Sequence, residues 1–266
     1  MNNKKIAIIG GGNLGQAIAN GIVNSNIVPA SNLTVTRRRV QLIQNLKELG
    51  INTISDNKEA AADADIIFLG VKPYQIQQIT EEISPVVKDS AMVISLATGV
   101  DAASIEKYFG KELAIFRAMP NTAIAIGESM TCISSHKASE EQEKVVLTLF
   151  EQVGQALIIP EELMASATVL AACGIAFALR FVRAATQGGI EIGFGADLAL
   201  QIAAQTVKGA ADLLIKEGSH PEHEIDKVTT PRGITISGLN EMEHQGFSSS
   251  LIKGLLTSFN KIENGK

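Results

Sequence analysis

Three glycines with a defined spacing follow the first apolar run of the chain. The run Ile6–Ile9 leads directly into the segment Gly10, Gly11, Gly12, Asn13, Leu14, Gly15. In a G-x-G-x-x-G turn, the first glycine permits the tight turn, the second lets a pyrophosphate approach the backbone, and the third lets the helix pack against the strand. The helix N-terminus then directs unpaired N–H groups at the anion. The segment is interpreted as a dinucleotide-binding turn, with a ligand-free glycine turn as the alternative.

A hydroxyl group and three guanidinium groups follow the second apolar run. This run ends near Thr36 and continues into Arg37, Arg38 and Arg39. A site selective for NAD carries Asp or Glu here, about twenty residues after the glycine turn, on the ribose 2′-hydroxyl. Arginine instead offers a planar, bidentate partner for a 2′-phosphate. The pattern favours NADP, and the alternative is three solvated arginines at the start of a surface helix.

Three further segments place polar side chains at the expected ends of strands or helices. Val71-Lys72-Pro73 ends a strand, and its lysine could act in catalysis, contact the cofactor or be solvated. Met119-Pro120-Asn121-Thr122 could wall a nicotinamide pocket or form an ordinary turn. The hydroxyl-rich segment 228–235 could bind a carboxylate, or could start a helix with Thr230 as the N-cap and Pro231 in the first turn.

Histidine and cysteine form no recognisable catalytic or metal-binding pattern in the sequence. The four histidines are scattered, and no Ser/His/Asp order can be assigned. The segment His220-Pro221-Glu222-His223 is expected to be a loop. Cys132 and Cys173 lie far apart, which argues against a disulfide framework or a zinc site and favours a reducing cytoplasm.

Short apolar runs alternate with helical patterns over the first part of the chain. This alternation predicts a Rossmann-type, doubly wound α/β domain with a parallel sheet and helices on both faces. A strand over 129–134, a helix over 139–150 and a short run over 156–159 should follow. The expected early strands are Lys5–Ile9, Leu33–Thr36, Asp65–Val71, Ala91–Leu96 and Leu113–Arg117.

Only helical segments are expected after Pro160, at about 163–188, 196–216, 235–245 and 248–260. The sequence therefore predicts a dinucleotide-binding domain over 1–160 and an all-helical domain over 161–266 for substrate binding and dimerisation. The stretch Leu163–Leu179 carries no charge and is interpreted as a buried helix, because its 17 residues fall just short of a membrane span. A second copy of the chain would cover it most simply.

Composition narrows the possible partners. The 266 residues are 45% hydrophobic with a net charge of −5, which disfavours a nucleic-acid partner. The apolar run Ile6–Ile9 is too short for a signal peptide, and no membrane partner is expected.

These motifs, in this order, resemble the Δ1-pyrroline-5-carboxylate reductase family, which catalyses the last step of proline synthesis. The resemblance covers nearly the whole chain. It implies a cytoplasmic enzyme that passes hydride from NADPH or NADH to the C=N carbon of a cyclic imine, and that forms homodimers, often assembled into rings, through its helical domain. It rests on Ile9–Gly15, Asn57-Lys58-Glu59, Val71-Lys72-Pro73, Arg117–Thr122 and Asp226–Gly233.

The resemblance also implies roles for individual residues. Thr235 would orient the imine nitrogen, and Thr230, Gly233 and Thr235 would hold the substrate. The implied cofactor-binding residues are Gly10, Gly11, Gly12, Asn13, Leu14, Gly15, Thr36, Arg37, Arg38, Asn57, Val71, Lys72, Pro73, Ala97, Met119 and Asn121.

The chain departs from the family pattern on the substrate side. Ala171-Ala172-Cys173-Gly174-Ile175-Ala176 stands where the family usually reads Ser-Gly-Ser-Gly-Pro-Ala, and Pro231-Arg232-Gly233-Ile234-Thr235 where it usually reads Pro-Gly-Gly-Thr-Thr. Two alternatives therefore remain: a relative that reduces another cyclic imine or a 3-hydroxy acid, and a non-catalytic dinucleotide-sensing protein. A hydroxy-acid enzyme needs a general acid/base, for which Lys72 is the candidate.

Overall fold

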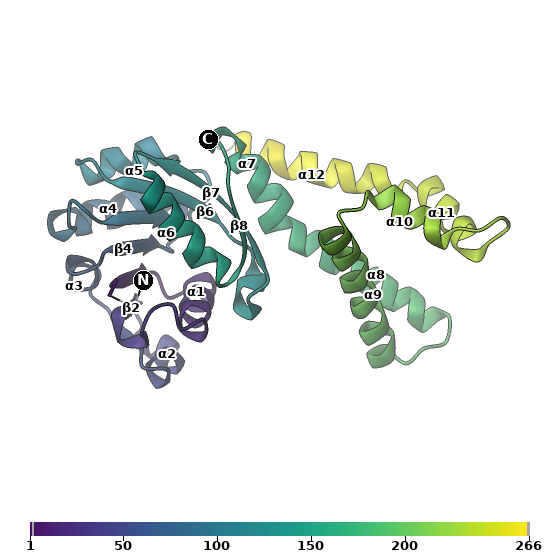
Figure 1. Cartoon of the computed structure of the whole chain (residues 1–266), viewed down its shortest axis with the longest axis horizontal. Helices are drawn as coiled ribbons and strands as arrows, with labels where there is room; N and C mark the ends of the chain where they lie inside the picture. Colours follow the sequence, from purple (N-terminus) through teal and green to yellow (C-terminus); the bar gives the residue numbers. More distant parts are fainter. Residues whose placement is uncertain (2, 265–266) are drawn as a thin grey trace. The chain divides into compact units, whose positions relative to one another are not determined.

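The computed structural model describes residue 1 and residues 3–264. Its internal contacts divide the chain into two compact units. The first contains Met1–Cys173 and the residues from Phe259 onward, and the second is Gly174–Ser258. The first unit is built on a single eight-stranded sheet, and the second is helical (Figure 1).

The sheet has the doubly wound arrangement that the alternating pattern predicts. Its strand order is β3-β2-β1-β4-β5-β6-β7-β8. Strands β1 to β6 are parallel, β7 is antiparallel to β6, and β8 is parallel to β7. The strand order reverses direction between β1 and β4, and such a switch point is where open α/β sheets bind ligands. The strands are β1 Ile6–Ile9, β2 Leu33–Thr36, β3 Asn52–Ile54, β4 Ile66–Leu69, β5 Met92–Ser95, β6 Ala114–Met119, β7 Ser129–His136 and β8 Gly154–Ile158.

Helices cover both faces of this sheet (Figure 1). In β1, Ile6 and Ile8 join a core with α1, α2 and α6, whereas Ala7 and Ile9 join a second core with α3, α4 and α5. The parallel strands are therefore buried on both sides and read as continuous apolar runs. The helices are α1 Asn13–Asn24, α2 Gln44–Glu48, α3 Asn57–Ala62, α4 Ile76–Ile83, α5 Ala102–Phe109 and α6 Glu140–Glu151. The 3₁₀ turns are η1 Ala30–Asn32, η2 Val40–Ile43, η3 Pro73–Gln75, η4 Ser84–Val86, η5 Thr122–Ile126 and η6 Glu161–Leu163.

Seven of these strands fall where the apolar runs predict them, and β3 is the strand that the sequence analysis missed. β3 has three residues, begins with the exposed Asn52 and lies at the edge of the sheet. A run of this length is too short to show a periodicity, so its pairing with β2 is decided by tertiary contact.

The chain after Pro160 differs from the predicted helices in three places. The predicted helix 163–188 is interrupted by a π-helical segment over Thr168–Cys173, and π-helical turns are frequent at functional sites. The expected loop at 220–223 is wrong, because α10 begins at Pro221 and His220 accepts the Glu222 N–H at 3.3 Å. Thr230 is not an N-cap, because Gly233 precedes the first residue of α11. The helices are α7 Met164–Ala167, α8 Gly174–Glu191, α9 Ala196–Glu217, α10 Pro221–Val228, α11 Ile234–His244 and α12 Phe247–Glu263.

The charge-free stretch is buried only in part within the single chain, where Met164, Ala167, Thr168 and Val169 are buried. Leu170 is 72% exposed and Leu179 is 61% exposed. By length and composition, the helical regions Glu161–Glu191 and Ala196–Glu217 are each long and apolar enough to cross a membrane. Core and interface helices of soluble proteins meet the same criteria, so length and composition alone do not separate a membrane segment from a protein interface.

Candidate dinucleotide-binding site

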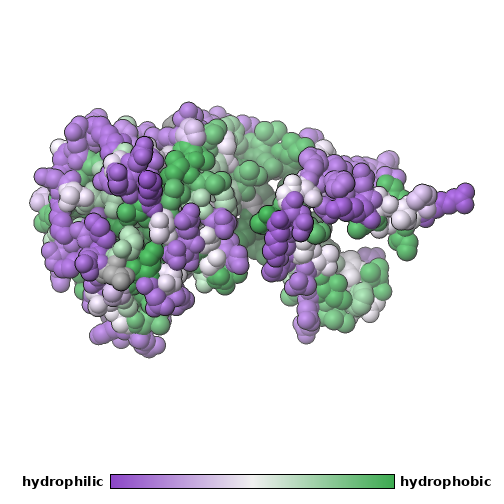
Figure 2. Space-filling model, in the orientation of Figure 1, coloured by the Kyte–Doolittle hydropathy of each residue, from purple (hydrophilic) through white to green (hydrophobic). Residues whose placement is uncertain are grey.

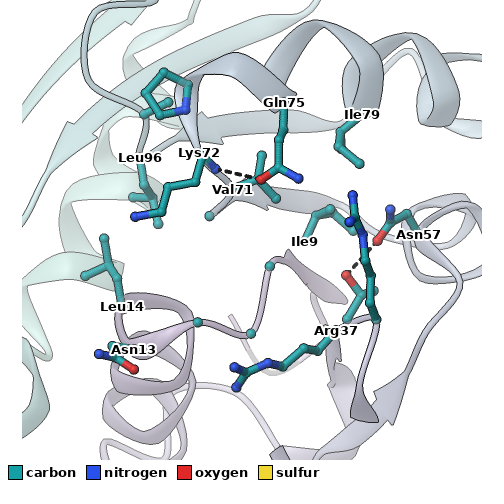
Figure 3. A pocket seen from close by; sticks show the side chains of 18 of the residues that line it. Ile9, Asn13, Leu14, Arg37, Asn57, Val71, Lys72, Gln75, Ile79 and Leu96 are labelled. Carbon is teal, nitrogen blue, oxygen red and sulfur yellow. Dashed lines mark hydrogen bonds between the residues drawn. The ribbon is translucent and has the colours of Figure 1, made fainter. Parts of the chain in front are cut away.

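A cavity of about 920 Å³ opens at the carboxyl ends of β1, β2, β4 and β5, beside the switch point of the sheet (Figure 3). It brings together thirteen of the sixteen residues expected to bind the cofactor, from five separate segments of the chain. Its lining is Ile9, Gly10, Gly11, Gly12, Asn13, Leu14, Thr36, Arg37, Arg38, Arg39, Leu42, Ser55, Asn57, Gly70, Val71, Lys72, Pro73, Gln75, Ile79, Leu96, Ala97 and Thr98.

The glycine turn forms the floor of the cavity, and the space available to a side chain differs among its three motif glycines. Gly10 has a φ of 112°, and a Cβ there would lie 2.6 Å from the Gly70 carbonyl oxygen. A Cβ at Gly15 would lie 2.2 Å from the carbonyl oxygen of Gly10, so only glycine lets α1 pack beneath the turn. A Cβ at Gly12 would enter open space, because beyond its immediate chain neighbours no atom of the described residues lies within 4 Å. The open space above Gly12 is where a ligand can approach the backbone.

The start of α1 is suited to an anion. Gly12 occupies the N-cap position, where other helices carry a hydroxyl or carboxylate side chain that accepts from the first-turn N–H groups. The first turn contains Asn13, Leu14 and Gly15, and Asn13 and Leu14 line the cavity. These N–H groups and the helix dipole favour a pyrophosphate, so the residues present fit a dinucleotide.

Thr36, at the end of β2, and Asn57, the first residue of α3, line the end of the cavity where the adenosine ribose is expected. Asp56 places Asn57 by accepting hydrogen bonds from the N–H groups of Lys58 and Glu59 at 2.8 and 3.1 Å, which starts α3. The buried Thr36 hydroxyl donates to Asn57 Oδ1 at 2.7 Å.

Three arginines follow Thr36 and line the same end of the cavity. Arg37 Nη1 donates to the Leu42 carbonyl oxygen at 3.2 Å, which folds its side chain toward η2 and leaves its remaining N–H groups as donors. Together with Arg38 and Arg39, Arg37 makes this end of the cavity strongly basic.

The segment after β4 forms the opposite wall. Val71, Lys72 and Pro73 lead into η3, where the Lys72 N–H donates to Gln75 Oε1 at 3.3 Å. Figure 3 shows the Lys72 side chain reaching across the cavity toward Leu14, above the glycine turn. Lys72 therefore has access to a bound anion from the side opposite α1.

Three of the expected cofactor residues do not line this cavity in the described structure. Gly15 lies beneath the turn, and Met119 is buried at the end of β6. Asn121 Nδ2 donates to the Ala171 carbonyl oxygen at 3.5 Å, and its Oδ1 accepts the Ala123 N–H at 3.0 Å. The side chain of Asn121 therefore joins η5 to the π-helical segment within the first unit.

Several lining residues were not singled out from the sequence. Gly70 and Thr98 follow β4 and β5, whose carboxyl ends would have indicated them, whereas Ser55 follows β3, which the sequence did not reveal. Ile79 lies on α4 and reaches the cavity only through the packing of that helix.

The expected substrate-binding residues lie together in the second unit. The Gly233 N–H donates to the Thr230 carbonyl oxygen at 2.8 Å, and a Cβ at Gly233 would lie 2.6 Å from the Thr230 hydroxyl. Arg232 has a φ of 59°, and Thr235 stands in the first turn of α11. The turn before α11 is tight enough to require glycine at position 233.

Neither cysteine is paired, and a metal site is not apparent in the described part of the chain. Over residues 1 and 3–264, no group of three or more His, Cys, Asp and Glu residues could hold a metal ion. Burial raises the pKa of the Cys132 thiol, and Cys173 is half-buried in the π-helical segment.

The fold and the cavity together define a Rossmann-type oxidoreductase that uses a dinucleotide cofactor. The chain is 46% identical to pyrroline-5-carboxylate reductase 2 of Dictyostelium discoideum, over 98% of this chain and 92% of that protein. It belongs to the pyrroline-5-carboxylate reductase family.

Other comparisons agree with this assignment. Residues 161–264 match the family model for pyrroline-5-carboxylate reductase dimerisation, and residues 5–99 match the model for the NADP oxidoreductase, coenzyme F420-dependent. Pyrroline-5-carboxylate reductase 1 of D. discoideum is 44% identical over 96% of this chain, which spans only 49% of that relative's length.

Two solved structures have the same fold along the whole chain. One is Plasmodium falciparum pyrroline carboxylate reductase with NADP bound, with 28% identity, a TM-score of 0.89, and coverage of 99% of this chain and 98% of that one. The other is a Coxiella burnetii pyrroline-5-carboxylate reductase, with 28% identity, a TM-score of 0.91 and the same coverage.

Proposed function

We propose that this protein reduces 1-pyrroline-5-carboxylate to L-proline with NADPH. The observation that carries the proposal is the switch-point cavity with its glycine turn and basic ribose end, in a chain of this family. The direct test is the oxidation of NADPH by the purified protein with and without pyrroline-5-carboxylate. Turnover of another cyclic imine in place of this one would support the alternative raised by the Ala171-Ala172-Cys173 departure.

The chain contributes binding and alignment to this reaction. The bound cofactor supplies the hydride that the C=N carbon accepts. The start of α1 holds the pyrophosphate, the arginines hold the ribose 2′-phosphate, and Lys72 adds a positive charge over the glycine turn.

The substrate requires little acid catalysis from the protein. A cyclic imine is readily protonated near neutral pH, and the resulting iminium carbon is already electrophilic. The chain must align that carbon and exclude water. We assign Thr235 to the imine nitrogen, and Thr230 and the backbone around Gly233 to the substrate carboxylate.

We further propose that the working form is a homodimer built through the helical domain, with rings of dimers as the larger assembly. The match of residues 161–264 to a dimerisation model supports an oligomer, and the exposed apolar helices of the second unit supply the surface. We expect a cytoplasmic enzyme that binds neither nucleic acid nor membrane.

Changing Arg37 and Arg38 together to Asp should reverse the order of cofactor affinity. The parent protein should bind NADPH more tightly than NADH, because both arginines line the ribose end. Losing a charge-assisted contact costs about 1.5–3 kcal/mol, or roughly a ten- to hundredfold weaker NADPH affinity. Titration calorimetry with each cofactor measures the change. Equal affinities of the parent protein for the two cofactors would contradict the assignment of these arginines.

Replacing Thr235 with Val tests the substrate assignment. Valine keeps the shape of the side chain and removes the hydroxyl, so kcat/KM for the imine should fall by about tenfold or more, while NADPH affinity stays unchanged. Steady-state kinetics and NADPH titration together measure both quantities. Unaltered kcat/KM would show that Thr235 only starts α11, and parallel weakening of both ligands would assign it a structural role.

A further inference from the structure

A carboxylate from a distant helix reaches the ribose end of the cavity through a relay of two hydrogen bonds. Glu82 lies on α4 and does not itself line the cavity among the described residues. Its Oε1 accepts a hydrogen bond from Asn57 Nδ2 at 3.3 Å. Asn57 Oδ1 in turn accepts from the Thr36 hydroxyl at 2.7 Å. Thr36 and Asn57 both line the cavity, so Glu82 contacts the cofactor site only through them.

The carboxylate decides which way the Asn57 amide points. At neutral pH a carboxylate only accepts hydrogen bonds, so the NH₂ group of Asn57 must face Glu82. The amide oxygen then faces Thr36, and an amide oxygen also only accepts. Thr36 has a single hydroxyl proton, which is therefore donated to Asn57.

This orientation has a consequence for the ligand that Thr36 meets. With its proton donated to Asn57, the Thr36 oxygen can offer only a lone pair to the cavity. A ribose 2′-hydroxyl can donate to that lone pair, as it donates to the carboxylate of an NAD-selective site. A 2′-phosphate has only acceptor oxygens once it is fully ionised, so it gains nothing from Thr36.

We infer that Glu82 is a specificity-determining residue that acts through Asn57 and Thr36 to restrain the preference for a 2′-phosphate. Its effect opposes that of Arg37, Arg38 and Arg39, which attract the phosphate. The balance leaves the chain able to use NADH as well as NADPH. This inference rests on the proposed cofactor site, and it is independent of which imine is reduced.

Replacing Glu82 with Gln should remove the restraint on the orientation of the Asn57 amide. A glutamine amide can donate to Asn57 Oδ1, which lets the Asn57 amide turn over and donate to Thr36. The Thr36 proton is then free to bind a phosphate oxygen. Removing the negative charge acts in the same direction, so the preference for a 2′-phosphate should rise by about tenfold.

The test uses two nucleotide fragments that need no catalysis. The affinities of adenosine 2′,5′-bisphosphate and of AMP are measured by titration calorimetry on the parent protein and on Glu82→Gln, with melting temperatures as the check on folding. Glu81→Gln is the matched control, because it removes the same charge from the neighbouring position of α4. Glu81 instead accepts a hydrogen bond from Gln77 Nε2 at 2.9 Å, on its own helix.

The expected result is an increase of about tenfold in the ratio of the two affinities in Glu82→Gln and less than twofold in Glu81→Gln. Glu82→Ala should shift the ratio in the same direction, since it also releases Asn57. An unchanged ratio in Glu82→Gln, or an equal shift in Glu81→Gln, would overturn the inference. Nucleotide binding without imine reduction would refute the proposed reaction and leave this inference standing, whereas binding of neither fragment would refute both.

Discussion

Gly12→Ala should weaken cofactor binding strongly without destabilising the protein, and Gly15→Ala should destabilise the fold. The backbone of Gly12 has φ −76° and ψ −170°, which alanine adopts without strain, and its new methyl would enter open space above the turn. That space is where the pyrophosphate must approach, so the methyl separates the phosphate from the α1 N–H groups. We expect the affinity for NADPH to fall by about a hundredfold or more.

The backbone around position 15 leaves no space for the methyl group of Gly15→Ala. This methyl would lie 2.2 Å from the backbone oxygen of Gly10, so α1 must move away from β1. Overpacking of this kind should cost about 3 kcal/mol or more, which lowers the melting temperature by about 10 °C in a chain of this size. Thermal unfolding and NADPH titration on both variants separate the two effects. A Gly12→Ala variant that binds NADPH normally would place the pyrophosphate elsewhere.

Leu179→Glu should convert the protein to inactive monomers. Leu179 lies on α8 and is 61% exposed in the single chain, as are other large apolar side chains of the second unit. Figure 2 shows hydrophobic surface gathered over the α8–α9 hairpin. The large apolar side chains on these two helices that are more than 40% exposed are Leu179, Phe181, Ile190, Leu198, Leu200, Ile202, Leu213 and Ile215.

An interface that covers this surface would be obligate and would bury about 2,000 Å² or more. A carboxylate buried in it without a partner costs several kcal/mol, so dimers should separate and the helical unit should lose stability. Light scattering coupled to gel filtration and an activity assay measure both outcomes. Leu179→Met is the control, because it keeps an apolar side chain of similar volume and should remain dimeric. A dimeric, active Leu179→Glu protein would exclude this face of α8 from the interface.

Local sequence was sufficient to predict the glycine turn that lines the cavity. The run Ile6–Ile9, the spacing of Gly10, Gly12 and Gly15, and the helix that follows all lie within about one βα unit, where strand pattern, turn geometry and helix start are set by neighbouring residues. The arginines after Thr36 were predictable for the same reason. The number of residues between each of them and the end of the preceding strand is enough to predict its position.

The surroundings of Met119 and Asn121 could not be predicted from neighbouring residues in the sequence. Both follow a strand at the ligand-binding edge, which suggested a pocket wall, yet the Asn121 side chain is held by Ala123 and by Ala171, fifty residues away. The π-helical segment over Thr168–Cys173 packs against β6 and β7, which are distant from it in the sequence.

By itself, the sequence determined seven of the eight strands, the glycine turn before α1, the run of arginines after Thr36 and the helical second half, because each is encoded in residues close together along the chain. Only the tertiary structure decided that α4 brings Glu82 to Asn57, and Asn57 to Thr36, across separations of 25 and 21 residues. It also decided that the apolar helices keep their faces uncovered in a single chain. Contacts between distant segments leave no periodic trace in the sequence, since they depend on how the sheet twists and which helices pack on each face.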